Sequence, residues 1–103
     1  MKRNERVPML SGKETLILEM LAAGIEMYGL QLVEAARGRL KRGTVYVTLG
    51  RMEDKGYLSS RAETPRAGAI GLPRRLYRPS ALGLRLLEAR AVVVRALAWE
   101  GAR

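Results

Sequence analysis

The polar residues with the clearest chemical pattern lie between positions 42 and 58. Val45, Leu49 and Met52 recur at helical spacing and predict the buried face of one helix. Hydroxyl and cationic side chains share another face of the same helix, at Thr44, Thr48, Arg51 and Lys55. Such groups reach base edges and phosphates in the major groove of DNA. The pattern favours a helix that reads DNA, and the alternative is an ordinary solvated helix face.

The chain has no cysteine and no histidine. The absence of cysteine excludes disulfides, thiolate nucleophiles and Cys-based zinc sites, and the absence of histidine removes the commonest metal ligand and general base. Its ten side-chain acids form no visible catalytic arrangement. We therefore expect a protein that is not an enzyme, with no catalytic residues, no metal site and no cofactor.

The positive charge of this 103-residue chain is placed unevenly. Of the net charge of +9, residues 41–79 carry +6, whereas residues 10–40 carry −1. A basic surface on one side indicates a polyanionic partner, although an arginine-rich composition that serves solubility is the alternative. No apolar run is long enough to span a bilayer. We expect no membrane partner and a cytoplasmic, nucleoid-associated location.

The elements that must position the polar helix follow from caps and breakers. A basic arm covers residues 1–9. The expected helices run from the Ser11–Glu14 capping box to about residue 24, from about 28 to 40 and from 42 to 56. Two short strands are expected at 57–62 and 75–78, joined by a turn rich in Gly and Pro. Ser80 then caps a last helix that ends near residue 99.

This order predicts a winged helix-turn-helix, mostly α with a small two-stranded β wing. In that arrangement the third helix enters the major groove, and the wing meets the adjacent backbone or minor groove. Arg42, at the entry to the third helix, suits a phosphate at the helix N-terminus. The wing contacts are expected from Arg66, Arg74 and Arg75.

The last helix carries more apolar surface than a small domain readily covers. We expect a homodimer that pairs through this helix, with interface residues Leu82, Leu86, Val93, Leu97 and Trp99. The alternative is that this surface covers the monomer's own core. Trp99 also suggests an interface pocket for a small flat apolar effector, although it can equally be a simple interface anchor.

The chain resembles the PadR-type transcriptional regulators, most closely the compact members that have a single C-terminal helix. The segments that carry this resemblance are Tyr28-Gly29-Leu30, Arg42-Gly43-Thr44-Val45-Tyr46, residues 49–58 and residues 75–83. Val47 departs from the pattern, because proline commonly follows the tyrosine. The resemblance implies a DNA-binding regulator in which Tyr46 lies near the DNA backbone; a Tyr46 packed half-buried between helices is the alternative.

Together these observations predict a sequence-specific regulator of transcription that binds double-stranded DNA, acting as a dimeric repressor. The expected organisation is an arm over 1–9, a winged-helix domain over 10–80 and a dimerisation helix over 81–103 within the same domain. Two alternatives remain open, a winged-helix module that binds protein and an architectural protein that binds DNA without sequence preference.

Overall fold

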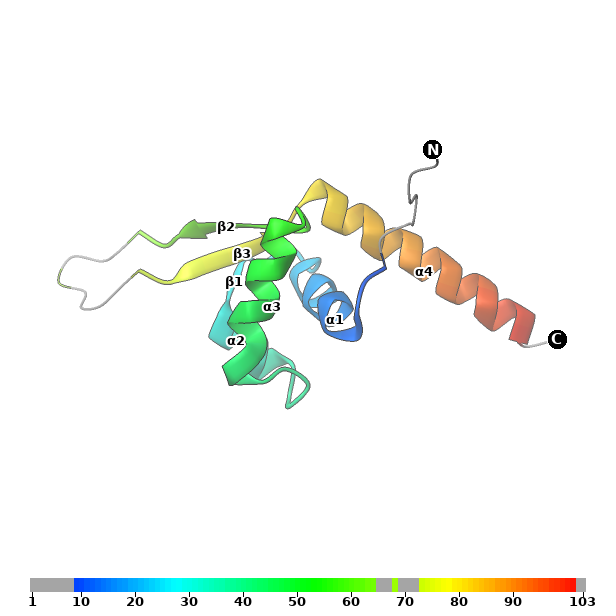
Figure 1. Cartoon of the computed structure of the whole chain (residues 1–103), viewed down its shortest axis with the longest axis horizontal. Helices are drawn as coiled ribbons and strands as arrows, with labels where there is room; N and C mark the ends of the chain where they lie inside the picture. The colour runs from blue at the N-terminus through cyan, green and yellow to red at the C-terminus, as the bar shows by residue number, and fades with distance from the viewer. Residues whose placement is uncertain (1–8, 65–67, 69–72, 102–103) are drawn as a thin grey trace, which may run out of the picture.

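The computed structural model describes residues 9–64, 68 and 73–101. Its elements follow in the order α1 (Gly12–Leu21), β1 (Met27–Tyr28), α2 (Gly29–Ala35), α3 (Arg42–Asp54), β2 (Leu58–Ala62), β3 (Arg75–Pro79) and α4 (Ala81–Gly101). The strands β2 and β3 project to one side of the helical body, and α4 runs out on the other (Figure 1). The predicted fold class, a mostly helical winged helix-turn-helix, is confirmed.

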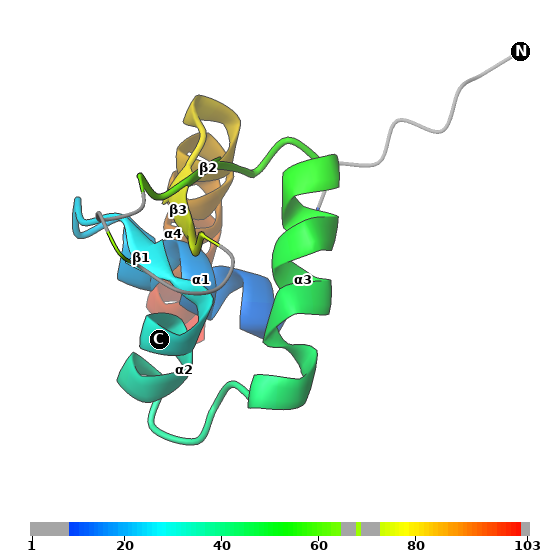
Figure 2. The ribbon, with the colours of Figure 1, turned by 90° about the vertical axis from the view of Figure 1, so that its left-hand side faces the viewer.

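The first three helices pack around an aliphatic core. The side chains of Ile17, Leu18, Leu32 and Leu49 are completely buried, and each contributes about 1.5–3 kcal/mol by leaving water. Val45, Leu49 and Met52 form the buried face of α3 as the helical spacing predicted. This seam fixes the rotation of α3 and leaves its opposite face outside, where no other described element covers it (Figure 2).

The N-terminus of α1 has the predicted capping box. The Glu14 N–H donates to Ser11 Oγ at 3.1 Å, and the Ser11 N–H donates to Glu14 Oε1 at 2.8 Å. Two backbone donors that the helix cannot pair are thereby satisfied. The cap also fixes the position of the Glu14 carboxylate, which pairs with Lys55 at the end of α3.

The second helix is shorter than the predicted range of 28–40. Arg37 and Gly38 adopt the left-handed region with φ of 50° and 89°, so the helical hydrogen-bond pattern ends before them. Leu40 is buried as a core residue although it lies in the turn between α2 and α3. The predicted helix bounds were therefore wrong at the C-terminal end.

The sheet has three strands, which corrects the prediction of a two-stranded wing. The third strand is β1, which pairs antiparallel with β3 through Met27–Tyr77 and Tyr28–Leu76, giving the order β1-β3-β2. The other edge of β3 pairs with β2, in a register that places Ser60 opposite Tyr77. A two-residue strand has no periodicity to detect, so the sequence could not predict it.

The helix α4 begins where Ser80 caps it, as predicted. Ser80 Oγ accepts the Gly83 N–H at 3.0 Å and donates to the Gly56 carbonyl at 2.5 Å. At Gly83 the helix crosses the chain at Tyr57 so closely that a Cβ would lie 2.2 Å from the Tyr57 carbonyl oxygen. This contact joins the first turn of α4 to the end of the helix-turn-helix.

Candidate nucleic-acid interface

The outward face of α3 consists of small side chains at its centre and polar side chains on its flanks. At about 100° per residue, Val47, Gly50 and Asp54 point directly away from the buried seam. Val47 is 53% exposed, and an added Cβ at Gly50 would meet no atom within 4 Å. None of these three central positions was among the predicted DNA-binding residues, although the helical spacing places them opposite the buried seam.

The predicted DNA-reading residues lie on one flank of that face. Thr44, Thr48, Arg51 and Lys55 border an open groove of about 740 Å³, whose other wall is formed by the start of α1. The Thr48 hydroxyl donates to the Thr44 carbonyl at 3.2 Å, a bond within the helix that leaves its lone pairs available. Within the described residues, Arg51 makes no side-chain hydrogen bond or ion pair. The flank thus offers two hydroxyls and one unengaged guanidinium.

Lys55, the fourth residue of that flank, is held by an ion pair. Its Nζ lies 2.7 Å from Oε2 of Glu14, whose side chain is only 7% exposed. Burial raises the pKa of Glu14, but the hydrogen bonds from Lys55 and Ser11 outweigh burial, so the pKa lies below its usual value. The hydrogen bond to Glu14 raises the pKa of Lys55. Lys55 therefore ties the end of α3 to α1.

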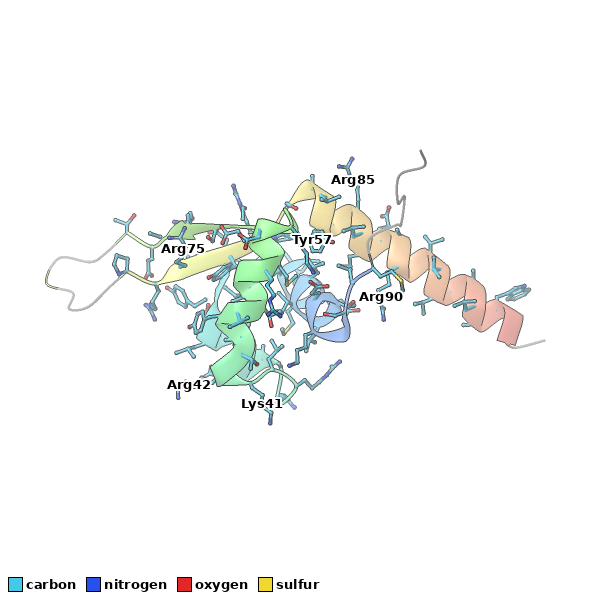
Figure 3. All side chains as sticks on the ribbon, viewed as in Figure 1. Lys41, Arg42, Tyr57, Arg75, Arg85 and Arg90 are labelled. Carbon is cyan, nitrogen blue, oxygen red and sulfur yellow. The ribbon has the colours of Figure 1, made fainter. Side chains whose placement is uncertain are left out.

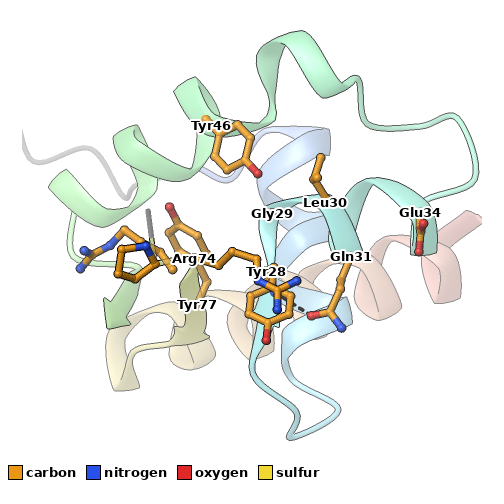
Figure 4. Close-up of a pocket in the computed structure, with 10 residues that line it drawn as sticks. Tyr28, Gly29, Leu30, Gln31, Glu34, Tyr46, Arg74 and Tyr77 are labelled. Atoms are coloured by element: carbon orange, nitrogen blue, oxygen red, sulfur yellow. Dashed lines mark hydrogen bonds between the residues drawn. The ribbon is translucent and has the colours of Figure 1, made fainter. Parts of the chain in front are cut away.

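The other flank of α3 opens onto a pocket of about 510 Å³ between α2, α3 and the base of the wing. The ring of Tyr46 packs so closely on Gly29 that a Cβ there would lie 2.5 Å from Tyr46 Cε1. Half of Tyr46 remains exposed, and its hydroxyl forms no hydrogen bond to any described residue. Figure 4 shows Tyr46 and Tyr77 on two sides of this pocket, with Arg74 between Tyr77 and Tyr28. The close contact with Tyr46 leaves no room for a side chain at position 29, which accounts for the glycine there. The Tyr46 hydroxyl is available to a phosphate.

The wing contributes cations with different degrees of engagement. Nε of Arg75 donates to Ser60 Oγ at 3.0 Å and Nε of Arg78 donates to Ser59 Oγ at 3.1 Å, so each is held by a neutral hydroxyl. Arg61 instead forms an ion pair with Glu26 at 2.8 Å, which lowers the pKa of Glu26. Lys41 and Arg42 at the start of α3 and Arg75 on the wing are labelled in Figure 3. The predicted wing residue Arg66 lies outside the described residues.

Arg74 belongs to a cluster that the sequence analysis missed. Its Nε donates to Glu63 Oε1 at 3.2 Å, and its guanidinium carbon lies 4.0 Å from the centre of the Tyr28 ring. The Tyr28 hydroxyl donates to the other Glu63 oxygen. An acid within the most basic stretch of the chain was the one available signal for this cluster.

The helix α4 changes character along its length. Its first turns pack on the core through Gly83, Leu86 and Leu87, whereas its later turns extend away from the body (Figure 1). Of the five predicted interface residues, Leu86 packs against its own chain. The other four are exposed, by 39% to 72%, at Leu82, Val93, Leu97 and Trp99. Three further valine and leucine side chains on this helix are also exposed, at Leu84, Val92 and Val94.

Among the described residues, none of the helices combines the length and the apolar composition that spanning a bilayer requires. No group of three or more Asp and Glu side chains there is placed to hold a metal ion. The features that remain are the cationic face of α3 and the wing, and the apolar end of α4.

Comparison with known proteins agrees with this geometry. Residues 17–89 match the model of the transcriptional regulator PadR-like family. A PadR family transcription regulator from Clostridium difficile R20291 is 28% identical with a TM-score of 0.69, over 82% of this chain and 88% of that chain. One from Eggerthella lenta DSM 2243 is 27% identical with a TM-score of 0.69, over 87% and 78%.

A PadR-like regulator from Bacillus cereus ATCC 14579 shares the fold at 20% identity, with a TM-score of 0.70 over 87% of each chain. The search of curated proteins returned no match. Because the family model covers most of the chain, including α2, α3 and the wing, the match includes the elements that form the candidate interface. The chain belongs to the PadR-like family of transcriptional regulators.

Proposed function

We propose that this PadR-like regulator is a homodimer that binds a pseudo-palindromic duplex sequence and represses transcription by occluding a promoter. The family assignment makes the chain a DNA-binding regulator. Sequence specificity, dimerisation and repression are the proposed refinements. One observation carries the proposal: the same chain has an outward α3 face with the unengaged Arg51 on its flank, and an α4 whose last turns are apolar and exposed.

The DNA contacts are proposed from the exposed face of α3 and the cations around it. A helix fits the major groove, and the hydroxyl, guanidinium and methyl groups of Thr44, Arg51 and Val47 suit base edges and thymine methyls. Arg42 at the start of α3 and Arg75 on the wing suit the flanking phosphates, as does the hydroxyl of Tyr46. Arg74 and Arg66 remain proposed wing contacts, and Lys55 is the weakest of the set because it is already paired.

The dimer is proposed from the end of α4. Val93 and Leu97 stand four residues apart and therefore share one face of the helix, and Leu97 is 66% exposed. Burial of such side chains contributes about 1.5–3 kcal/mol each. The same apolar face of a second copy can bury them in a two-fold dimer. Such a two-fold dimer would present the two α3 helices about 34 Å apart, one turn of DNA. Residues 81–103 are accordingly the proposed dimerisation segment.

The decisive experiment is selection of bound sequences from a random duplex pool by the full chain, with the mass in solution measured by light scattering. The proposal expects enrichment of one inverted repeat with half-sites about 10 base pairs apart and the mass of two chains. Equal binding of all duplexes would indicate an architectural protein instead. Binding to no duplex at low salt would indicate a protein-binding module.

The sign of regulation and an effector need separate measurements. Repression predicts less transcript in vitro from a promoter that overlaps the selected sequence, and an increase would identify an activator. An effector site at the dimer interface is proposed at Trp99, which is 72% exposed in the single chain. A planar apolar compound bound there would change Trp99 fluorescence and release DNA, whereas a panel without any fluorescence change would remove the effector from the proposal.

A further inference from the structure

The wing root carries a negative charge where a polyanion is expected to approach. Glu63 follows β2 directly, and its carboxylate lies next to Arg74, just before β3. A carboxylate near DNA phosphates is electrostatically unfavourable, and a partner cation offsets this only in part. The charge of Glu63 therefore does not account for its position near the expected DNA, and its contacts must be considered instead.

The geometry around Glu63 indicates that role. One carboxylate oxygen accepts the Tyr28 hydroxyl, and the other accepts Nε of Arg74 at 3.2 Å. The guanidinium of Arg74 also lies 4.0 Å over the Tyr28 ring, the stacking visible in Figure 4. A backbone bond from the Glu63 N–H to the Arg74 carbonyl, 2.7 Å long, continues the ladder beyond β2 and β3. Each of the three side chains thus contacts the other two.

The cluster joins two parts that contact DNA in the proposed function. Tyr28 is the N-cap of α2, its N–H donates to Gln31 Oε1 at 2.8 Å, and it pairs with Leu76 across the sheet. Glu63 and Arg74 are the base of the wing. A change in these contacts would therefore alter the angle between the wing and the helix-turn-helix, because β2 and β3 project away from the helical body (Figure 1).

We propose that Glu63 is a positioning residue for DNA recognition. It holds Arg74 against Tyr28, so that the wing and α3 meet one stretch of DNA in a fixed relation. The Arg74 side chain is 65% exposed, and its two terminal nitrogens form no hydrogen bond to the described residues, so they can bind a phosphate while Nε is held. This inference rests on the proposed function, because it assigns Glu63 to sequence specificity.

The positioning role and a simple charge effect predict different results. If Glu63 only lowers the local positive charge, Glu63→Gln increases the affinity for every duplex and steepens the salt dependence equally. If Glu63 positions the wing, Glu63→Gln lowers the affinity for the selected duplex relative to a random duplex. We expect this ratio to fall about tenfold, equivalent to 1.4 kcal/mol, because an unaligned wing loses phosphate contacts only in the specific complex.

The test measures the dissociation constants for the selected and a random duplex at several salt concentrations. The variants are Glu63→Gln, Tyr28→Phe and their combination. Glu34→Gln is the matched control, because Glu34 lines the same pocket and its carboxylate forms no hydrogen bond to a described residue. We expect each single variant to lower the affinity for the selected duplex relative to the random duplex. The combination should lower this ratio no further than the larger single effect, because the two side chains act through one contact. The control should leave the ratio unchanged.

Equal behaviour of Glu63→Gln and Glu34→Gln would overturn the inference and leave the proposed function intact. A wild-type chain that prefers no sequence would overturn both. Thermal melting checks the fold of each variant, and Tyr28→Phe carries the test if Glu63→Gln is unfolded, because it removes a single oxygen. An unchanged ratio in a folded Tyr28→Phe variant would also count against the inference.

Discussion

The helices α3 and α4 both expose one long face, and the two faces differ in chemistry. α3 presents small and polar side chains beside cations, and its seam of Val45, Leu49 and Met52 is buried in the core. α4 is packed on the core at its first turns and leaves valine, leucine and tryptophan exposed along the rest of its length. Exposed polar and cationic groups are satisfied by water or by an anion, whereas exposed aliphatic groups gain free energy only from another apolar surface. Two exposed helices in one small chain therefore indicate two different kinds of partner.

The largest expected effect is at the root of α4, where Gly83 touches the Tyr57 carbonyl. Gly83→Ala places a Cβ 2.2 Å from that backbone oxygen, so either α4 or the β2 segment must move. We expect the free energy of unfolding to fall by about 3 kcal/mol, at the upper end for an overpacked site. Urea titration followed by circular dichroism measures this, with Gly12→Ala as a control because its added Cβ meets no atom within 4 Å. Equal stability of the two variants would show that the crossing is not tight.

The next largest effect concerns self-association through the exposed C-terminal turns of α4. Leu97→Glu introduces a charge into the proposed dimer interface and is expected to weaken self-association about thirtyfold, or about 2 kcal/mol. The monomer should remain folded, because Leu97 touches little of its own chain. Sedimentation measures the mass. Glu88→Gln, about 180° from Leu97 around the helix and about three turns before Trp99, should leave the mass unchanged. A dimer insensitive to Leu97→Glu would place the interface elsewhere.

A smaller effect compares two cations on α3. Arg51→Ala should weaken binding of the selected duplex about tenfold, since the Arg51 guanidinium forms no hydrogen bond or ion pair with the described residues and is available to the DNA. Lys55→Met should change DNA affinity less and lower stability by at most about 1 kcal/mol, because Lys55 is half-exposed and paired with Glu14. Fluorescence anisotropy with both variants checks the order of the effects. A larger loss of DNA affinity in Lys55→Met than in Arg51→Ala would mean that Lys55 leaves Glu14 and binds the DNA.

Gly50 tests whether the centre of the α3 face approaches a partner closely. Glycine inside a helix costs about 0.5–1 kcal/mol relative to alanine, and an added Cβ at Gly50 meets no atom of the chain. Gly50→Ala should therefore raise the free energy of unfolding by that amount and weaken DNA binding. Thermal melting and anisotropy measure the two quantities. A stabilised variant with unchanged DNA affinity would show that DNA keeps its distance from Gly50.

The smallest effect concerns the pH dependence of the Glu14–Lys55 pair. Because the pKa of Glu14 is lowered in the folded chain, its contribution to stability is present above about pH 4.5 and is lost as the pH falls through the lowered value. Glu14→Gln keeps a side chain that suits the capping box and removes this titration. Unfolding between pH 3 and 7 should show a stability difference between the two proteins that shrinks toward acid. A constant difference would mean that the ion pair contributes nothing.

Much of the framework could be predicted from local patterns. The caps at Ser11 and Ser80, the buried seam of α3 and the two strands of the wing each depend on neighbours in the sequence, where spacing is informative. Most of the predicted Gly/Pro-rich turn between those strands lies outside the described residues. The strand β1 was missed because two residues carry no period. The helix α2 was predicted too long because Arg37 is left-handed, a conformation that its residue type does not signal.

The sequence by itself determined that the chain is basic on one side, has no His or Cys chemistry, and contains a helix with one apolar seam and one polar flank. The tertiary structure decided which of those cations are engaged. Glu14 and Glu63 lie 41 and 11 residues from the cations that they hold, Lys55 and Arg74, and no local spacing reports such pairs. The tertiary structure also decided that α4 leaves the core after its first turns. An amphipathic helix has the same periodicity whether its apolar face packs on its own chain or is left exposed for a partner chain.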